Sequence, residues 1–448
     1  MPASFGLLAS VALCLFVCES CRRLSSRTPR TPRPAVWWWV AGLIVSYAAI
    51  LALIFFAARH QFPAEAWRSA LMPLAVVDDR ASAGQVPGVT LVAAAMLYLA
   101  AFQSYALLAL YRQEPARTAV GIGCGIMLLL SCAAPALTSF DLYLYVRDAL
   151  LGFAAYRPPN VPFLGAYHVF DLWLGTPRPM LYGPLWPIVA GLVTSLAPTL
   201  FAKLMTLRAL GLLSFLAVLA GLRAFGVPSR ILNVFALNPG LMLQYVANGH
   251  NDLIAIAALV WAAAVVRKRA SLAFGLIAIA GLFKAPFVLL GLPIVAAVRS
   301  VRLRVAGSIA AFVAVAAISW LGAGNGYFKT LAEYGAKNVA PFVGQISGFI
   351  AVALIVLAAA GGRRLRSGVW IVPALGAILF PWYFVWGLPY ALARRRVLGY
   401  LLVCFPFAAM LAGPFVLPWA VVLVAVWVVG LSLREPGAAL DAARAGRV

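Results

Sequence analysis

The sequence predicts an all-α fold, a polytopic bundle of transmembrane helices. Hydrophobic residues make up 64% of the 448 positions, charged residues only 10%, and the mean hydropathy is +0.98. Because a soluble domain carries roughly a quarter of its residues as charged side chains, lipid must surround most of this chain. The apolar runs are continuous rather than alternating, so they predict helices and not barrel strands, the only other structure that satisfies its backbone inside a bilayer.

The apolar runs have the length of membrane spans, as in Val36–Ala58, Val89–Leu110 and Val305–Leu321. At about 1.5 Å per residue such runs cross the hydrocarbon layer, and the whole chain gives about thirteen spans. One region, Tyr182–Arg223, must cross an odd number of times but contains two apparent helices broken at Ala197–Pro198. Either one of these helices is re-entrant or a short neighbour does not cross.

The net charge of +23 is distributed in small basic clusters between the apolar runs. This is the pattern of cytoplasmic loops, so no nucleic acid is expected as a partner. The clusters are Arg22–Arg33, Arg112/Arg117, Arg223/Arg230, Arg267–Arg269, Arg299–Arg304, Arg363–Arg366, Arg394–Arg396 and Arg434–Arg447. They predict an integral, multi-pass protein of the plasma (inner) membrane whose functional residues face the outer side.

Only twelve acidic residues are present, so the candidates for acid–base chemistry are few. Five of them are predicted at outer membrane edges, where a carboxylate is costly unless it is paired or functional: Asp141, Asp148, Asp171, Asp252 and Glu333. At helical spacing Asp141 shares a face with Tyr145 and Asp148. It could open a short amphipathic helix on the membrane surface, or act as a general base at a partly buried rim. Both interpretations can hold together.

The predicted outer loop that follows Asp141 is rich in aromatic and arginine residues, including Arg147 and Arg157, and ends in the motif Tyr182–Trp186. Flat rings and guanidinium groups would bind a sugar and a lipid phosphate. The alternative is the aromatic belt found at membrane interfaces, although that belt does not require arginines on the outer side.

Further polar residues interrupt later apolar stretches. A tight turn would explain most of Asn248–Asp252, but it would not need both His250 and Asp252. Lys284 stands alone in an apolar hairpin, where it could extend to the interface or supply a counter-charge for a phosphate. The segment Phe380–Trp386 is predicted to be an aromatic hairpin tip.

Together these motifs resemble a known family. An aspartate at the end of a span, Tyr-Gly-Pro-Leu-Trp, Asn-Gly-His-Asn-Asp, Lys-x-Pro and Pro-Trp-Tyr follow one another in order between about Thr118 and Tyr400. This order resembles the GT-C superfamily of integral membrane glycosyltransferases, and most closely the bacterial polyprenyl-phosphate-mannose-dependent α-mannosyltransferases. The resemblance implies transfer of a hexose, mannose in those relatives, from a lipid-linked donor to a glycan or glycolipid acceptor on the outer face of the membrane.

The resemblance, joined to the chemistry, assigns a role to each candidate residue. Asp141 would be the catalytic base. The donor phosphate would be bound by Lys284, Arg147 and Arg157, and the sugar or acceptor by Tyr182, His250, Asp252, Trp382 and Tyr383. No Asp-x-Asp pair accompanies Asp141 and no cysteine has metal-ligand spacing with histidines, so neither a metal nor a cofactor is predicted.

The implied reaction is a single displacement, which inverts the anomeric centre and needs one carboxylate base. A transporter or lipid-linked sugar flippase is the main alternative, with Lys284 and Asp252 as a coupling pair. A non-catalytic assembly subunit is a third possibility, and it predicts no loss of rate when Asp141 is replaced.

The predicted organisation has four parts. They are N-terminal transmembrane helices (1–117), a GT-C-like catalytic core (118–300) with an outer loop (139–182), C-terminal transmembrane helices (301–433) with an outer loop (325–344), and a cytoplasmic tail (434–448).

Overall fold

The computed structural model describes residues 35–59, 89–113, 116–134, 141–157, 179–338, 385–394 and 397–407. Every regular element in these ranges is a helix, which confirms the predicted all-α class. The elements are α2 (Ala35–Arg59), α4 (Val89–Gln113), α5 (Arg117–Ala133), α6 (Asp141–Leu151), the 3₁₀-helix η1 (Gly152–Tyr156), α8 (Leu185–Ser195), α9 (Leu200–Phe225), α10 (Ser229–Ala236), α11 (Pro239–Leu241), the π-helix η2 (Met242–Ala247), α12 (Asp252–Val265), α13 (Ala270–Phe283), α14 (Pro286–Leu290), α15 (Leu292–Val295), α16 (Val301–Asn338), α19 (Leu388–Arg394) and α20 (Val397–Phe407).

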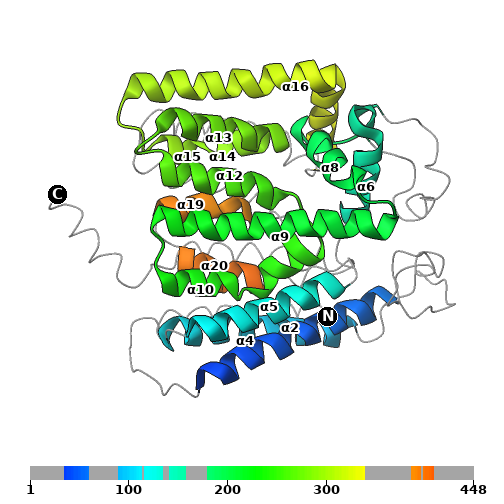
Figure 1. The fold of residues 1–448 in the computed structure, drawn as a ribbon, viewed down its shortest axis with the longest axis vertical. Coiled ribbons are helices and arrows are strands. Elements are labelled where there is room, and N and C mark those ends of the chain that lie inside the picture. The colour runs from blue at the N-terminus through cyan, green and yellow to red at the C-terminus, as the bar shows by residue number, and fades with distance from the viewer. Residues whose placement is uncertain are drawn as a thin grey trace, which may run out of the picture.

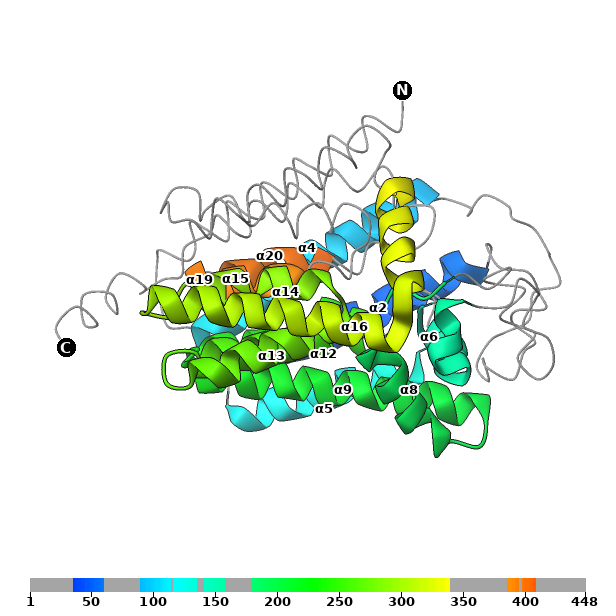
Figure 2. The same cartoon turned by 90° about the horizontal axis from the view of Figure 1, so that it is seen from above.

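The longer helices lie side by side with similar axis directions, as Figure 1 shows. α12 packs between α9 and α13. α16 covers one side of this stack, whereas α2, α4 and α5 lie on the opposite side (Figure 1). The short helices α6 and α8 pack together at one end of the stack, next to the bent end of α16 (Figures 1 and 2).

Three of the described helices are long and apolar enough to cross a membrane: Val36–Phe56, Leu200–Phe225 and Val301–Glu333. The last of these leaves large apolar side chains exposed, including Leu321 at 84%. A soluble protein would normally cover such a surface, so this face is suited to lipid. The total of about thirteen spans stays a prediction, because several predicted spans lie outside the described residues.

The break predicted within Tyr182–Arg223 is present. α8 ends at Ser195, and α9 begins after Thr199, whose hydroxyl caps the new helix by accepting the Ala202 N–H at 3.1 Å. The eleven residues of α8 extend only about 16 Å at 1.5 Å per residue, roughly half of the hydrocarbon thickness. α9, with 26 residues, has the length of a full span. By length and composition, α9 is a candidate span and α8 is not, so the number of crossings in this region stays a prediction.

α16 changes direction at Gly324, whose backbone has φ of +63°. Only glycine adopts this left-handed region without steric cost. Figure 2 shows the sharp turn between the two parts of this helix. The segment 325–344, suggested by the sequence as an outer loop, is helical as far as Asn338. Because of the kink at Gly324, this second part of α16 runs in a different direction from the first part.

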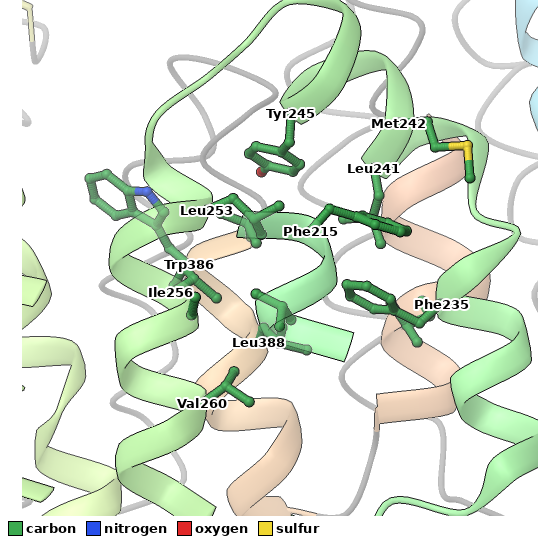
Figure 3. Packing of buried hydrophobic residues seen from close by; sticks show 14 of the residues in the cluster. Phe215, Phe235, Leu241, Met242, Tyr245, Leu253, Ile256, Val260, Trp386 and Leu388 are labelled. Atoms are coloured by element: carbon green, nitrogen blue, oxygen red, sulfur yellow. The ribbon is translucent and has the colours of Figure 1, made fainter. Parts of the chain in front are cut away.

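A compact apolar core lies beneath the turn between η2 and α12 (Figure 3). Phe215 of α9 stacks on Phe235 of α10 with ring centroids 5.0 Å apart. Figure 3 shows three side chains of α12 directed into the same core, namely Leu253, Ile256 and Val260. Because protein interiors are close-packed, this core determines the position of Asp252, the first residue of α12.

α6 differs from the surface helix that the sequence suggested. It begins at Asp141 as expected, but six of its eleven residues are buried, because it packs on α8 and α9. A helix resting on a membrane surface would bury only its apolar face. The buried residues here include both Arg147 and Asp148, so α6 is part of the protein core.

Candidate active site

The centre of the candidate site is the turn Asn248–Asp252, which joins η2 to α12. Gly249 has φ of +64°, a conformation that L side chains rarely adopt. A Cβ atom at Gly249 would lie 2.5 Å from Leu142 Cδ1 of α6. The glycine therefore lets the turn approach α6 closely. π-Helical turns such as η2 are frequent at functional sites, and here η2 leads directly into this turn.

Asp141 lies beside His250 of the turn. Asp141 Oδ2 is 3.3 Å from His250 Nδ1, and the aspartate side chain is 22% exposed whereas the imidazole is fully buried. Asp141 is the first residue of α6, where the positive end of the helix dipole stabilises a carboxylate. The pair thus presents one accessible carboxylate next to a fully buried imidazole.

The next residue, Asn251, contacts a second side chain of α6. The Tyr145 hydroxyl donates to Asn251 Oδ1 at 3.3 Å and accepts a hydrogen bond from the Tyr182 hydroxyl at 3.3 Å. Burial raises the pKa of Tyr145 well above its ordinary value, and the carboxylates of Asp141 and Asp252 raise it further. The Tyr145 hydroxyl therefore stays protonated between the two acids.

The third residue, Asp252, is buried together with Lys284. Lys284 Nζ donates to Asp252 Oδ1 at 2.9 Å, and the Trp386 ring N–H donates to the same oxygen at 2.8 Å. The ammonium also lies 5.4 Å from the centre of the Tyr182 ring and 5.1 Å from that of Trp386, within cation–π range. Lys284 is only 9% exposed, so its ammonium lies among these side chains and not at the protein surface.

Helix geometry explains why Asp252 and Lys284 meet. Asp252 begins α12, Lys284 follows the last residue of α13, and only Val266–Arg269 connect the two helices. The start of α12 and the end of α13 therefore lie at the same end of this antiparallel pair. The helix dipoles favour an acid at the first position and a base at the second.

Gly183 brings Tyr182 to Lys284. Its N–H donates to the Phe283 carbonyl at 2.8 Å. A Cβ atom at Gly183 would lie 2.1 Å from the Leu282 carbonyl oxygen, closer than any real side chain comes. The Tyr156 hydroxyl donates to the Tyr182 carbonyl at 2.8 Å and fixes this segment from the other side.

Two of the predicted phosphate-binding residues stand apart from these contacts. Arg147 is 3% exposed and forms an ion pair with Asp148, with Nη2 at 2.9 Å from Oδ1. Burial raises the pKa of Asp148 to about 6, against the opposing effect of Arg147. Arg157 is exposed, and its guanidinium lies beside Gly324 and Gly326 at the bend of α16.

The structure thus brings together five of the predicted residues: Asp141, Tyr182, His250, Asp252 and Lys284. Trp382 and Tyr383 lie outside the described residues. Trp386, three residues further along, was not predicted as a site residue although it belongs to the same aromatic segment. Tyr145 was noted only as sharing a face with Asp141, and its contact with Asn251 was not foreseen.

The arrangement combines an accessible carboxylate, a buried imidazole, and an ammonium enclosed by aromatic rings. A carboxylate of this kind can accept a proton from a hydroxyl group, and an ammonium can stabilise developing negative charge. Within the described ranges, no group of three or more His, Cys, Asp or Glu side chains is placed to hold a metal ion.

Comparison with protein families gives one match. The model described as alpha-(1->6)-mannopyranosyltransferase, N-terminal domain, matches residues 39–301, which is more than half of the 448 residues. The matched range contains all five residues that meet in the site. No curated protein and no solved structure matches the chain.

Proposed function

The chain belongs to the alpha-(1->6)-mannopyranosyltransferase family, and from this premise we propose that it is a membrane enzyme that takes mannose from a polyprenyl-phosphate donor. The acceptor is a hydroxyl group of a glycan or glycolipid. The apolar helices support a donor that stays in the bilayer, because such a donor is too hydrophobic to leave it. A site at the helix ends could receive its phosphate at the membrane rim.

The observation that carries the proposal is the pattern of contacts made by His250, Asn251 and Asp252. These consecutive residues contact Asp141, Tyr145 and Lys284 respectively. A single turn therefore places a candidate base and a candidate phosphate-binding cation on either side of one tyrosine hydroxyl. Such pre-arranged groups can lower a transfer barrier without reorganising during the reaction.

In the proposed reaction the oxygen of the acceptor hydroxyl forms a bond to C1 of mannose. Asp141 accepts the proton that this hydroxyl loses. The bond between C1 and the phosphate oxygen breaks, and the lipid phosphate keeps that electron pair. One displacement inverts the anomeric centre, so a second catalytic carboxylate is not needed. His250 holds Asp141 in position.

Lys284 is the proposed partner of the departing phosphate, and it would be shared between that phosphate and Asp252. The exposed Arg157 could bind the donor before transfer. Arg147 is less suited to this role than the sequence suggested, because Asp148 already neutralises its guanidinium.

The proposed outer location is supported by the ends of the helices. Arg267–Arg269 connect α12 to α13 at the end opposite to Asp252 and Lys284. If the basic loop is cytoplasmic, as the positive-inside rule predicts, the site faces outward.

This orientation can be tested by placing single cysteines at two exposed positions, Arg157 and Lys268, in a protein whose native cysteines are replaced by serine. The two cysteines should react with an impermeant thiol reagent from opposite sides of the membrane, Arg157→Cys from the outside. Labelling of Lys268→Cys from the outside would reverse this orientation.

A transfer assay tests the proposal directly. Purified protein in detergent should move mannose from synthetic polyprenyl-phosphate mannose to an α-mannoside acceptor, and a nucleotide-linked mannose should not serve as donor. Transfer from the nucleotide donor alone would disprove the lipid-linked donor.

A transporter or flippase remains the second candidate, favoured by the buried Asp252–Lys284 pair, since buried acid–base pairs often mark transport pathways. Failure of transfer with every donor, together with movement of lipid-linked sugar across vesicles, would establish that function instead.

A further inference from the structure

Arg208 is a buried charge inside a candidate membrane span. It lies in the first half of α9, and only 5% of the residue is exposed. A charge at such a position is costly unless its donors are satisfied, and it is a candidate functional residue when found.

The guanidinium of Arg208 donates to three backbone carbonyls. Nη1 donates to the Cys132 oxygen at 2.7 Å, Nη2 to the Ala134 oxygen at 2.6 Å, and Nε to the Ala247 oxygen at 3.0 Å. The first two carbonyls end α5 and the third ends η2. The C-terminal end of a helix leaves carbonyls without intrahelical partners and carries partial negative charge. The single guanidinium of Arg208 therefore compensates the partial charge of two such ends.

Each of these ends precedes a residue of the site in the sequence. Ala134 precedes Asp141 by seven positions, and Ala247 precedes His250 by three. One turn further along α9, a Cβ atom at Gly211 would lie 2.1 Å from the Tyr245 carbonyl oxygen. α9 and η2 are thus in close contact next to the guanidinium, and small movements of one would be transmitted to the other.

We propose that Arg208 is a positioning residue, which helps to set the distance between Asp141 and His250 by holding the end of α5, seven positions before Asp141, against the end of η2, three positions before His250. This role rests on the proposed transfer function, in which that pair is the catalytic centre. Arg208 acts through the backbone and does not itself touch a substrate. Lysine could not replace it, since its single ammonium cannot match the fixed fork of donors that spans three separate carbonyls.

The test compares Arg208→Lys and Arg208→Met with the matched variant Lys203→Met. Lys203 is also a buried cation of α9 that donates to a backbone carbonyl, but its partner is Thr194 at the far end of α8. Arg208→Lys should lower kcat by about 100-fold with the donor KM within about threefold, because misplacement by about 1 Å costs that much in rate. Hydrogen exchange of peptides covering Asp141–Tyr145 and Asn248–Asp252 should become faster.

The outcomes separate the alternatives. Wild-type kcat and wild-type exchange in Arg208→Lys would overturn the proposal, and so would equal losses in Lys203→Met, which would show a general effect of buried cations in α9. If Arg208→Met cannot be purified, Arg208→Lys decides alone. If the wild-type protein transfers no mannose, the proposed function fails, while the exchange data still show whether Arg208 fixes the two segments.

Discussion

Replacement of Asp141 by asparagine is expected to lower the rate of mannose transfer by about 10²–10⁴-fold, the usual contribution of a general base. Asparagine keeps the shape of the side chain and its contact with His250, but it cannot accept a proton. Since Asp141 is 22% exposed, the variant should fold and still bind the donor. Steady-state transfer kinetics, with thermal unfolding to confirm the fold, measure this effect.

Glu333→Gln is the matched control. Glu333 was among the five acids predicted at the membrane edge, but it is about half exposed and pairs only loosely with Lys329, at 3.9 Å. Its neutralisation should leave transfer unchanged. If Asp141→Asn transfers mannose normally while Asp252→Asn is inactive, the base lies in the turn and not at the start of α6. Full transfer activity in both variants would show that neither carboxylate is the base.

Removal of either charge of the Lys284–Asp252 pair should have the second large effect, which acts on stability as well as on transfer. Breaking a buried ion pair by removing one partner typically costs about 3–5 kcal/mol, since the other charge is left uncompensated. Lys284→Met and Asp252→Asn should each lower the unfolding temperature in detergent. Lys284→Met should also worsen the donor KM or kcat by at least about tenfold, equivalent to about 1.4 kcal/mol.

The double variant Lys284→Met/Asp252→Asn distinguishes structure from function. Removing both charges takes away the uncompensated one, so the unfolding temperature should recover toward that of the wild type. Transfer should stay slow, because the departing phosphate still lacks its cation. A double variant that is both stable and active would show that the pair only supports the fold, and would leave Arg157 as the candidate phosphate-binding residue.

The sequence predicted the helical class and five of the polar or aromatic residues that meet in the site, because both follow from local patterns. Apolar runs of span length require helices, and isolated acids and bases between such runs require partners. The sequence could not specify most of the partners, which are set by packing between distant segments. Asp252 and Lys284 are 32 positions apart, and although the transport alternative suggested them as a pair, their contact with Trp386 depends on where α19 packs.

Two features have signals in the sequence itself. Arg147 and Asp148 are adjacent, and an adjacent opposite charge should have lowered the expectation that Arg147 binds a phosphate. Arg208 interrupts an apolar helix of span length, which by itself marks a buried cation that needs partners. The identity of those partners, three helix-end carbonyls, depends on how α5 and η2 pack against α9 and is not readable from the pattern.

The short helices α12 and α13 have a consequence for the lipid environment. Each contains fourteen residues, about 21 Å of helix, whereas the hydrocarbon layer is about 30 Å thick. With the Arg267–Arg269 loop at one boundary, the Asp252–Lys284 pair would lie about 9 Å below the other boundary. If the donor is lipid-linked, as proposed, a phosphate at headgroup level must then descend into the protein, or the membrane must thin around it. Bilayer thickness would then set how far such a donor has to travel before it meets Lys284.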